Sequence, residues 1–109
     1  EMPPQVHDML VAATSHLPHI IASVLAATVK GQGEQIIPLI ASGFLDTTRV
    51  AQGDARMWKD ICLTNQESIV EMLERFRCVL DEWEQAIRDG NWDRLEEMFG
   101  AVREWRKDI

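Results

Sequence analysis

The stretch Thr14-Ser15-His16-Leu17-Pro18-His19 places a proline and two histidines inside a segment whose apolar residues recur at helical spacing. A proline within a helix costs about 3 kcal/mol, because it has no N–H to donate and its ring crowds the carbonyl one turn earlier. A sequence that accepts this cost beside two imidazoles indicates a bent helix that holds polar groups at the wall of a pocket. We interpret the rest of the chain as the scaffold of that wall, together with an arginine-bearing loop that faces it.

Apolar residues lie three or four positions apart on both sides of this stretch, which predicts a helix. They are Val6, Met9, Leu10, Ala13, Leu17, Ile20, Ile21 and Val24. Pro3 and Pro4 suit the start of a helix, and Gly31 and Gly33 suit its end. We therefore predict one long, kinked N-terminal helix.

Shorter helices are predicted after it. Asp46, Thr47 and Thr48 are residue types that favour the first position of a helix, so we expect them to open a short one. Gln52-Gly53-Asp54 then breaks the chain, and Asp54 is expected to cap the next helix.

The last part of the sequence predicts an antiparallel helical hairpin. Thr64-Asn65-Gln66-Glu67 has the pattern of a capping box, and an apolar helix pattern follows it until Gly90. Asn91 is expected to cap the final helix, and Trp83, Trp92 and Trp105 are expected to pack the hairpin. No strand pattern occurs, so the predicted fold class is all-α, with about five or six helices.

The composition argues against two classes of binding partner, nucleic acids and membranes. The 109 residues are enough for one helical domain, residues 1–109, and the formal net charge of −7 argues against nucleic acid. No apolar run approaches the roughly 18 residues that a bilayer span needs, so we expect no membrane segment. The opening Glu1-Met2-Pro3-Pro4 has no signal-peptide pattern and looks like a linker, which suggests a piece of a longer protein.

The two cysteines, Cys62 and Cys78, share no metal or redox spacing. We expect reduced thiols in a cytoplasmic protein, with a disulfide as the alternative. The long first helix has a wider apolar stripe than the short helices after it can cover. This favours association of two copies, unless the terminal hairpin covers the stripe within one chain.

Arg49 is the strongest candidate for a ligand-binding residue. It follows Asp46-Thr47-Thr48 in a run without other charges, where its guanidinium can hold a carboxylate or phosphate in a bidentate manner. Two threonine hydroxyls and helix N-terminal amides would add donors. The alternative is an ion pair between Arg49 and Asp46.

His16 can donate a hydrogen bond to a substrate oxygen or move a proton near neutral pH, or it can be a half-buried histidine bonded to a backbone carbonyl. His16 and His19 form an HxxH pair, but no third ligand is fixed, so we expect no metal site. Trp58 can wall a pocket or belong to the core.

Three blocks of residues, in their order and spacing, resemble the C-terminal domain of the prephenate dehydrogenase family. They are His7-Asp8 with Ser15-His16-Leu17-Pro18-His19, then Ala41-Ser42-Gly43-Phe44-Leu45-Asp46-Thr47-Thr48-Arg49-Val50-Ala51, then Met57-Trp58-Lys59-Asp60-Ile61 with Asn65. The family makes 4-hydroxyphenylpyruvate from prephenate, or tyrosine from arogenate, by NAD(P)-dependent oxidative decarboxylation in tyrosine biosynthesis. The resemblance implies an N-terminal Rossmann domain for the nucleotide and a helical domain that forms an interlocked homodimer.

The resemblance also implies roles for individual residues. His16 would line the substrate site and act in catalysis, and Arg49 would bind a substrate carboxylate. Asp46 would join an ionic network at the pocket mouth, across the dimer, and Trp58 would support the pocket wall. The sequence has no GxGxxG fingerprint, so NAD or NADP is expected only in the full-length enzyme, and the fragment is expected to be inactive. The alternative is a helical dimerisation or adaptor module without chemistry.

Overall fold

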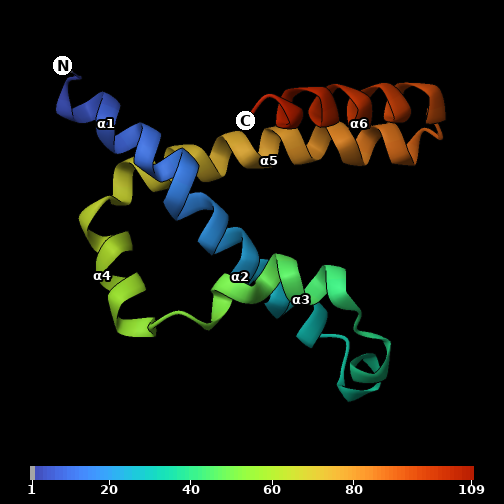
Figure 1. Cartoon of the computed structure of the whole chain (residues 1–109), viewed down its shortest axis with the longest axis horizontal. Coiled ribbons are helices and arrows are strands. Elements are labelled where there is room, and N and C mark those ends of the chain that lie inside the picture. The colour runs from blue at the N-terminus through green and yellow to red at the C-terminus, as the bar shows by residue number, and fades with distance from the viewer. Residues whose placement is uncertain (1) are drawn as a thin grey trace. The chain divides into compact units, whose positions relative to one another are not determined.

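The computed structural model describes residues 2–109, and every regular element in that range is helical. The elements, labelled in Figure 1, are α1 (Pro4–Val11), the π-helical segment η1 (Ala12–His16), α2 (Leu17–Lys30), the 3₁₀ segment η2 (Glu34–Leu39), α3 (Ser42–Thr48), the 3₁₀ segment η3 (Arg49–Gln52), α4 (Ala55–Thr64), α5 (Gln66–Arg88) and α6 (Trp92–Lys107). The predicted all-α class with about five or six helices is confirmed. Backbone contacts divide the chain into two compact units, Glu1–Leu73 and Glu74–Ile109.

The predicted long first helix is present, and a π-helical turn accommodates its proline. The segment η1 lies between α1 and α2, and the N–H of Leu17 reaches back five residues to the carbonyl of Ala12. Pro18 comes directly after this turn, inside a helix that continues from Pro4 to Lys30, so the backbone lacks one hydrogen-bond donor there. The turn is widened where the proline ring would crowd the carbonyl of Thr14 in a regular helix.

The core of the first unit forms where the long helix meets α4 and the start of α5. Ala12, Ile69 and Met72 are buried there, and Ala12 is fully enclosed. Partly buried apolar residues surround them: Met9, Ala13, Leu17, Ile20, Ile61, Cys62 and Leu73. The small side chain of Ala12 allows the helices to approach closely at this point. The core therefore fixes α4 beside the segment that carries both histidines.

The second unit is the predicted hairpin. Gly90 has φ 64°, its N–H donates to Ile87, and the N–H of Asn91 donates to Ala86, which together form a Schellman motif. Asn91 caps α6 through the backbone N–H of Arg94, as predicted. Figure 1 shows α6 running back beside α5, and the rings of Trp83 and Phe99 meet edge to face at 4.8 Å. The other two tryptophans expected in this packing, Trp92 and Trp105, are 61% and 68% exposed, so that part of the prediction is wrong.

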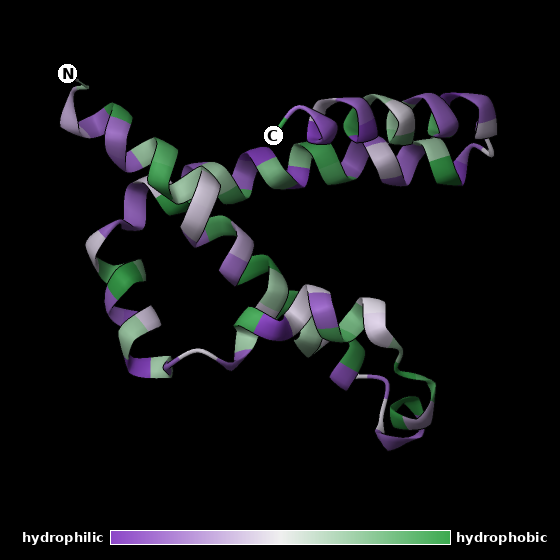
Figure 2. Cartoon of the chain, in the orientation of Figure 1, coloured by the Kyte–Doolittle hydropathy of each residue, from purple (hydrophilic) through white to green (hydrophobic). Residues whose placement is uncertain are grey.

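Hydrophobic residues recur along the long N-terminal helix (Figure 2), and several of them are exposed within the first unit, including Val6, Leu10 and Val24. The expectation that no apolar segment is long enough for a membrane is wrong by length and composition. Pro4–Lys30 is a 27-residue helix with an 18-residue window of mean hydropathy 1.5, of which 11% is buried. An apolar helix inside a soluble protein passes the same test, and a helix that pairs with a second protein copy presents the same uncovered stripe.

Candidate functional site

His16 is held by the asparagine that joins α4 to α5. The side-chain nitrogen of Asn65 lies 3.3 Å from Nδ1 of His16 and donates a hydrogen bond of 3.0 Å to the backbone carbonyl of Asp8. One alternative from the sequence was a half-buried histidine bonded to a backbone carbonyl. His16 is half-buried, but its partner is the side-chain amide of Asn65. Asn65 therefore ties three segments together: the end of α4, α1 and the end of the π-helical turn.

An open hollow of about 430 Å³ lies around these groups, and we call it the His16 hollow. Its lining residues come from α1, η1, α4 and the α4–α5 junction: His7, Asp8, Val11, His16, Met57, Asp60, Ile61, Thr64 and Asn65. The imidazole and amide groups in this lining can donate or accept hydrogen bonds, and Val11, Met57 and Ile61 offer apolar contact. The hollow can thus hold a small molecule with one apolar face and several oxygen atoms.

Trp58 contacts both histidines of the opening stretch. Its ring meets His16 edge to face at 6.1 Å and is stacked on His19 at 3.6 Å, with 10° between the planes. Gly53 closes this group, because a Cβ there would lie 3.0 Å from Cε1 of His19 and 3.0 Å from Nε1 of Trp58. Trp58 thus fixes the orientation of two imidazoles, and it is neither among the buried core residues nor among the residues that line the His16 hollow.

Arg49 and Asp46 lie elsewhere in the first unit. Asp46, Thr47 and Thr48 are the last residues of α3, so the expectation that they open a helix is wrong. The hydroxyls of Thr47 and Thr48 donate to the carbonyls of Gly43 and Phe44, one turn earlier, and so are not available as donors to a ligand.

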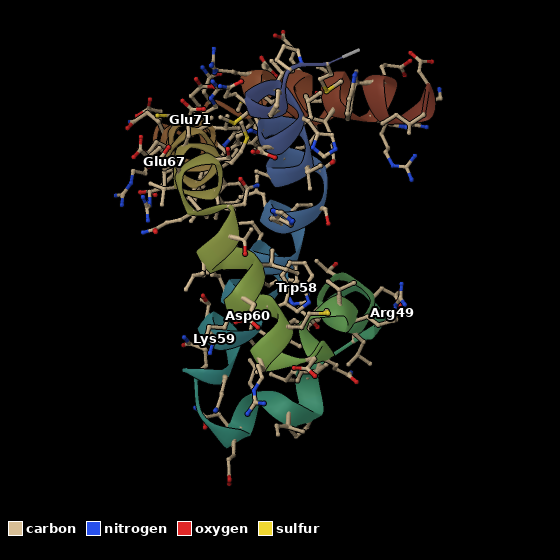
Figure 3. All side chains as sticks on the ribbon, turned by 90° about the vertical axis from the view of Figure 1, so that its left-hand side faces the viewer. Arg49, Trp58, Lys59, Asp60, Glu67 and Glu71 are labelled. Carbon is tan, nitrogen blue, oxygen red and sulfur yellow. The ribbon has the colours of Figure 1, made fainter. Side chains whose placement is uncertain are left out.

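The Arg49 side chain is exposed at the junction of α3 and η3, and it is not among the residues that line the His16 hollow. Figure 3 shows it on the outer edge of this segment, pointing away from Trp58. Within residues 2–109 no ion pair joins Arg49 to Asp46, so the ion-pair alternative is not realised in this chain. One chain thus brings His16 and Trp58 together but leaves Arg49 and Asp46 apart from them.

The charged groups at the His16 hollow are acidic. Asp8 and Asp60 are both exposed, with Nδ1 of His7 3.7 Å from Asp8 and Nζ of Lys59 3.9 Å from Asp60. Exposed pairs of this length contribute little to stability. In the part of the chain that is described, no group of three or more histidine, cysteine or carboxylate side chains could hold a metal ion, and Cys62 and Cys78 are free thiols.

The contacts of Asn65 were not predicted from the sequence, whose pattern indicated a capping box at Thr64-Asn65-Gln66-Glu67. Thr64 is the last residue of α4, and its hydroxyl donates to the carbonyl of Asp60, so the capping box is absent. Asn65 instead uses its amide on partners 57 and 49 positions away. The one sequence signal that pointed to Asn65 was its presence in the blocks of residues that resemble the family.

Comparison with known proteins identifies the family of this chain. Residues 3–101 match the family profile described as "Prephenate dehydrogenase, dimerization domain". The chain belongs to this family. A cyclohexadienyl dehydrogenase of Zymomonas mobilis is 38% identical over 97 residues, which cover 85% of this chain and 33% of that protein.

Two solved structures have the same fold. The arogenate dehydrogenase of Synechocystis has a TM-score of 0.91 at 27% identity, and the match covers 98% of this chain and 40% of that one. The prephenate dehydrogenase of Aquifex aeolicus, solved with hydroxyphenyl propionate and NAD⁺, has a TM-score of 0.91 at 32% identity, covering 99% and 39%. This chain therefore spans about a third of the Zymomonas protein and about two fifths of the solved chains.

Proposed function

We propose that this chain is the dimerisation and substrate-closing domain of an NAD(P)-dependent dehydrogenase that converts prephenate to 4-hydroxyphenylpyruvate by oxidative decarboxylation. Arogenate, converted to tyrosine, is the alternative substrate. The observation that carries the proposal is the family match over residues 3–101. The Aquifex aeolicus relative was solved with hydroxyphenyl propionate, an aromatic acid, which supports a ligand of this class. Free thiols at Cys62 and Cys78 fit an enzyme of the cytoplasm.

The nucleotide belongs, on this proposal, to another part of a longer protein. A dinucleotide site needs a strand, a glycine-rich turn and a helix, and the described residues contain no strand. The sequence has no GxGxxG motif either. The residues of this chain therefore do not fit NAD or NADP, and we assign both to an N-terminal Rossmann domain.

This chain's own residues bind and orient the substrate. Prephenate carries two carboxylates, and the acidic groups Asp8 and Asp60 at the His16 hollow cannot balance them. Arg49 is the cation that we assign to a substrate carboxylate, with Asp46 in an ionic network at the mouth of the pocket. Because Arg49 lies away from the hollow in its own chain, a second copy of the domain would bring an Arg49 to it.

His16 is assigned a place against a substrate oxygen, and Trp58 supports it from the side. Two imidazoles fixed by one indole suit a positioning role, and correct placement of a reacting molecule lowers the barrier without acid or base chemistry. The homodimer fits the uncovered apolar stripe of the long helix.

The test uses the longer protein that contains this chain. Arg49→Ala should raise KM for prephenate about 10- to 150-fold, since a charge-assisted hydrogen-bonded pair contributes about 1.5–3 kcal/mol and each 1.36 kcal/mol is tenfold. Arg77→Ala, which removes an exposed arginine from α5, is the matched control and should leave KM unchanged. NAD(P)H formation gives the rates, and circular dichroism checks folding. An unchanged KM in folded Arg49→Ala would contradict the assignment.

Two further measurements separate the enzyme from an adaptor. The purified 109-residue chain should form dimers in sedimentation equilibrium and should not turn over prephenate or arogenate with NAD⁺ or NADP⁺. The longer protein should turn over one of them. Absence of any turnover by the longer protein would leave a helical dimerisation module.

A further inference from the structure

The proposed function assigns no role to Asn65. It lies between the last residue of α4 and the first of α5, and its side chain is directed at two groups that are far away in sequence. A residue needed only to end a helix would not require an amide that bridges Asp8 and His16. The two contacts together determine what His16 can do.

The orientation of the Asn65 amide follows from its first contact. The backbone carbonyl of Asp8 can only accept a hydrogen bond, so the NH₂ group of Asn65 must face it at 3.0 Å, and not the amide oxygen. That NH₂ group has a second hydrogen, and Nδ1 of His16 lies 3.3 Å from the same nitrogen. Both hydrogens of the amide thus have an acceptor.

The tautomer of His16 follows from the second contact. An NH₂ group donates and does not accept, so Nδ1 of His16 must carry its lone pair and not a proton. Neutral imidazole has a single N–H, which must then be on Nε2. A protonated imidazole would set an N–H against an N–H at this contact.

We propose that Asn65 is a positioning residue that holds His16 as the neutral Nε2–H tautomer. His16 then offers a hydrogen-bond donor, and no acceptor, to a ligand in the His16 hollow, so it selects an oxygen acceptor such as a carboxylate. This inference rests on the proposed function for its substrate, but the tautomer itself depends only on the geometry of this chain.

The ¹⁵N spectrum of histidine tests the tautomer directly. In the ¹⁵N-labelled 109-residue chain near pH 8.5, where histidines are ordinarily neutral, Nδ1 of His16 should resonate as a bare nitrogen and Nε2 as a protonated one. His16→Gln identifies the signals by their loss. In Asn65→Asp the partner becomes an acceptor of the same size, so the proton should move to Nδ1.

Asn91→Asp is the matched control. It makes the same change at the cap of α6, far along the chain from His16, and should leave the His16 signals as in the unmodified protein. A protonated Nδ1 in the unmodified chain, or a folded Asn65→Asp whose His16 signals do not change, would overturn the proposal. If Asn65→Asp does not fold, the spectrum of the unmodified chain decides.

Kinetics of the longer protein test the consequence. Asn65→Ala, which adds no charge, should raise KM about five- to tenfold with a much smaller change in kcat, because the donor on His16 loses its fixed direction. An unchanged KM would refute the positioning role even if the tautomer is as expected. Failure of the proposed function has another signature, since the unmodified longer protein would then turn over neither prephenate nor arogenate.

Discussion

Gly53→Ala is the substitution for which the structure gives the sharpest expectation. The new Cβ would lie 3.0 Å from both His19 Cε1 and Trp58 Nε1, closer than side-chain carbons normally approach. The two rings are stacked on each other at 3.6 Å, so moving either ring away from the new methyl group disturbs the stack. The backbone itself tolerates alanine, since Gly53 has φ −64° and ψ 167°. The cost therefore comes from the rings and not from the chain conformation.

The magnitude has two parts of opposite sign. Placing a methyl group against the two rings costs about 1–3 kcal/mol, and this figure includes the loss of an aromatic stack worth about 0.5–1.5 kcal/mol. Alanine also lowers the entropy of the unfolded chain, which stabilises the protein by about 0.4–1 kcal/mol. We expect Gly53→Ala to lower the free energy of unfolding by about 0.5–2 kcal/mol.

Urea denaturation followed by circular dichroism, at one fixed protomer concentration, measures this change. Gly43→Ala is the control, because no atom lies within 4 Å of a Cβ built there in α3, and it should raise the stability. His19→Ala should remove part of the Gly53→Ala penalty when the two are combined, because it removes one of the two rings that the new Cβ would meet. If Gly53→Ala stabilises the protein as much as Gly43→Ala does, the reasoning about the confined rings is refuted.

Two further predictions concern the scaffold of the site. Ala12→Leu should destabilise the protein by about 1–3 kcal/mol in the same urea assay, because Ala12 is fully enclosed beside Ile69 and Met72. An unchanged urea midpoint would show that this core can accept a larger side chain. Asp54→Ala should cost about 1 kcal/mol, because the carboxylate accepts from the N–H groups of Arg56 and Met57 at the start of α4, whereas Asp54→Asn should restore most of the loss.

Local signals in the sequence were enough to predict elements whose ends depend on neighbouring residues. The hairpin between α5 and α6 follows from Gly90 and Asn91, because a left-handed glycine and a side-chain cap act within one helical turn. The start of α4 follows from Asp54 in the same way. The prediction failed for Thr47 and Thr48, because a threonine that favours a helix start also bonds well to the carbonyl one turn earlier.

The site needed information that local patterns do not contain. Pro18 indicated a distorted helix, but the form of the distortion, a π-helical turn that ends at His16, depends on how α1 and α2 continue one another. The bond between Asn65 and Asp8 joins residues 57 positions apart, so no periodicity could reveal it. The family resemblance named His16 and Trp58, and the structure brought them together with His19.

The long helix is largely uncovered, and Arg49 lies apart from the His16 hollow. Formation of a dimer would account for both features. The long helix has 11% of its most apolar window buried, and Arg49 is exposed on the outer edge of its segment (Figure 3). A hollow with acidic lining cannot bind a dianion tightly by itself, because the carboxylates of Asp8 and Asp60 repel the negative charges of the ligand. If a second copy covers the helix and also brings Arg49 to the hollow, then dissociation of the dimer removes the substrate site while leaving Asn65 and His16 in place. Dimer strength would then set substrate affinity, and dilution of the longer protein below its dissociation constant should raise KM before it unfolds the chain.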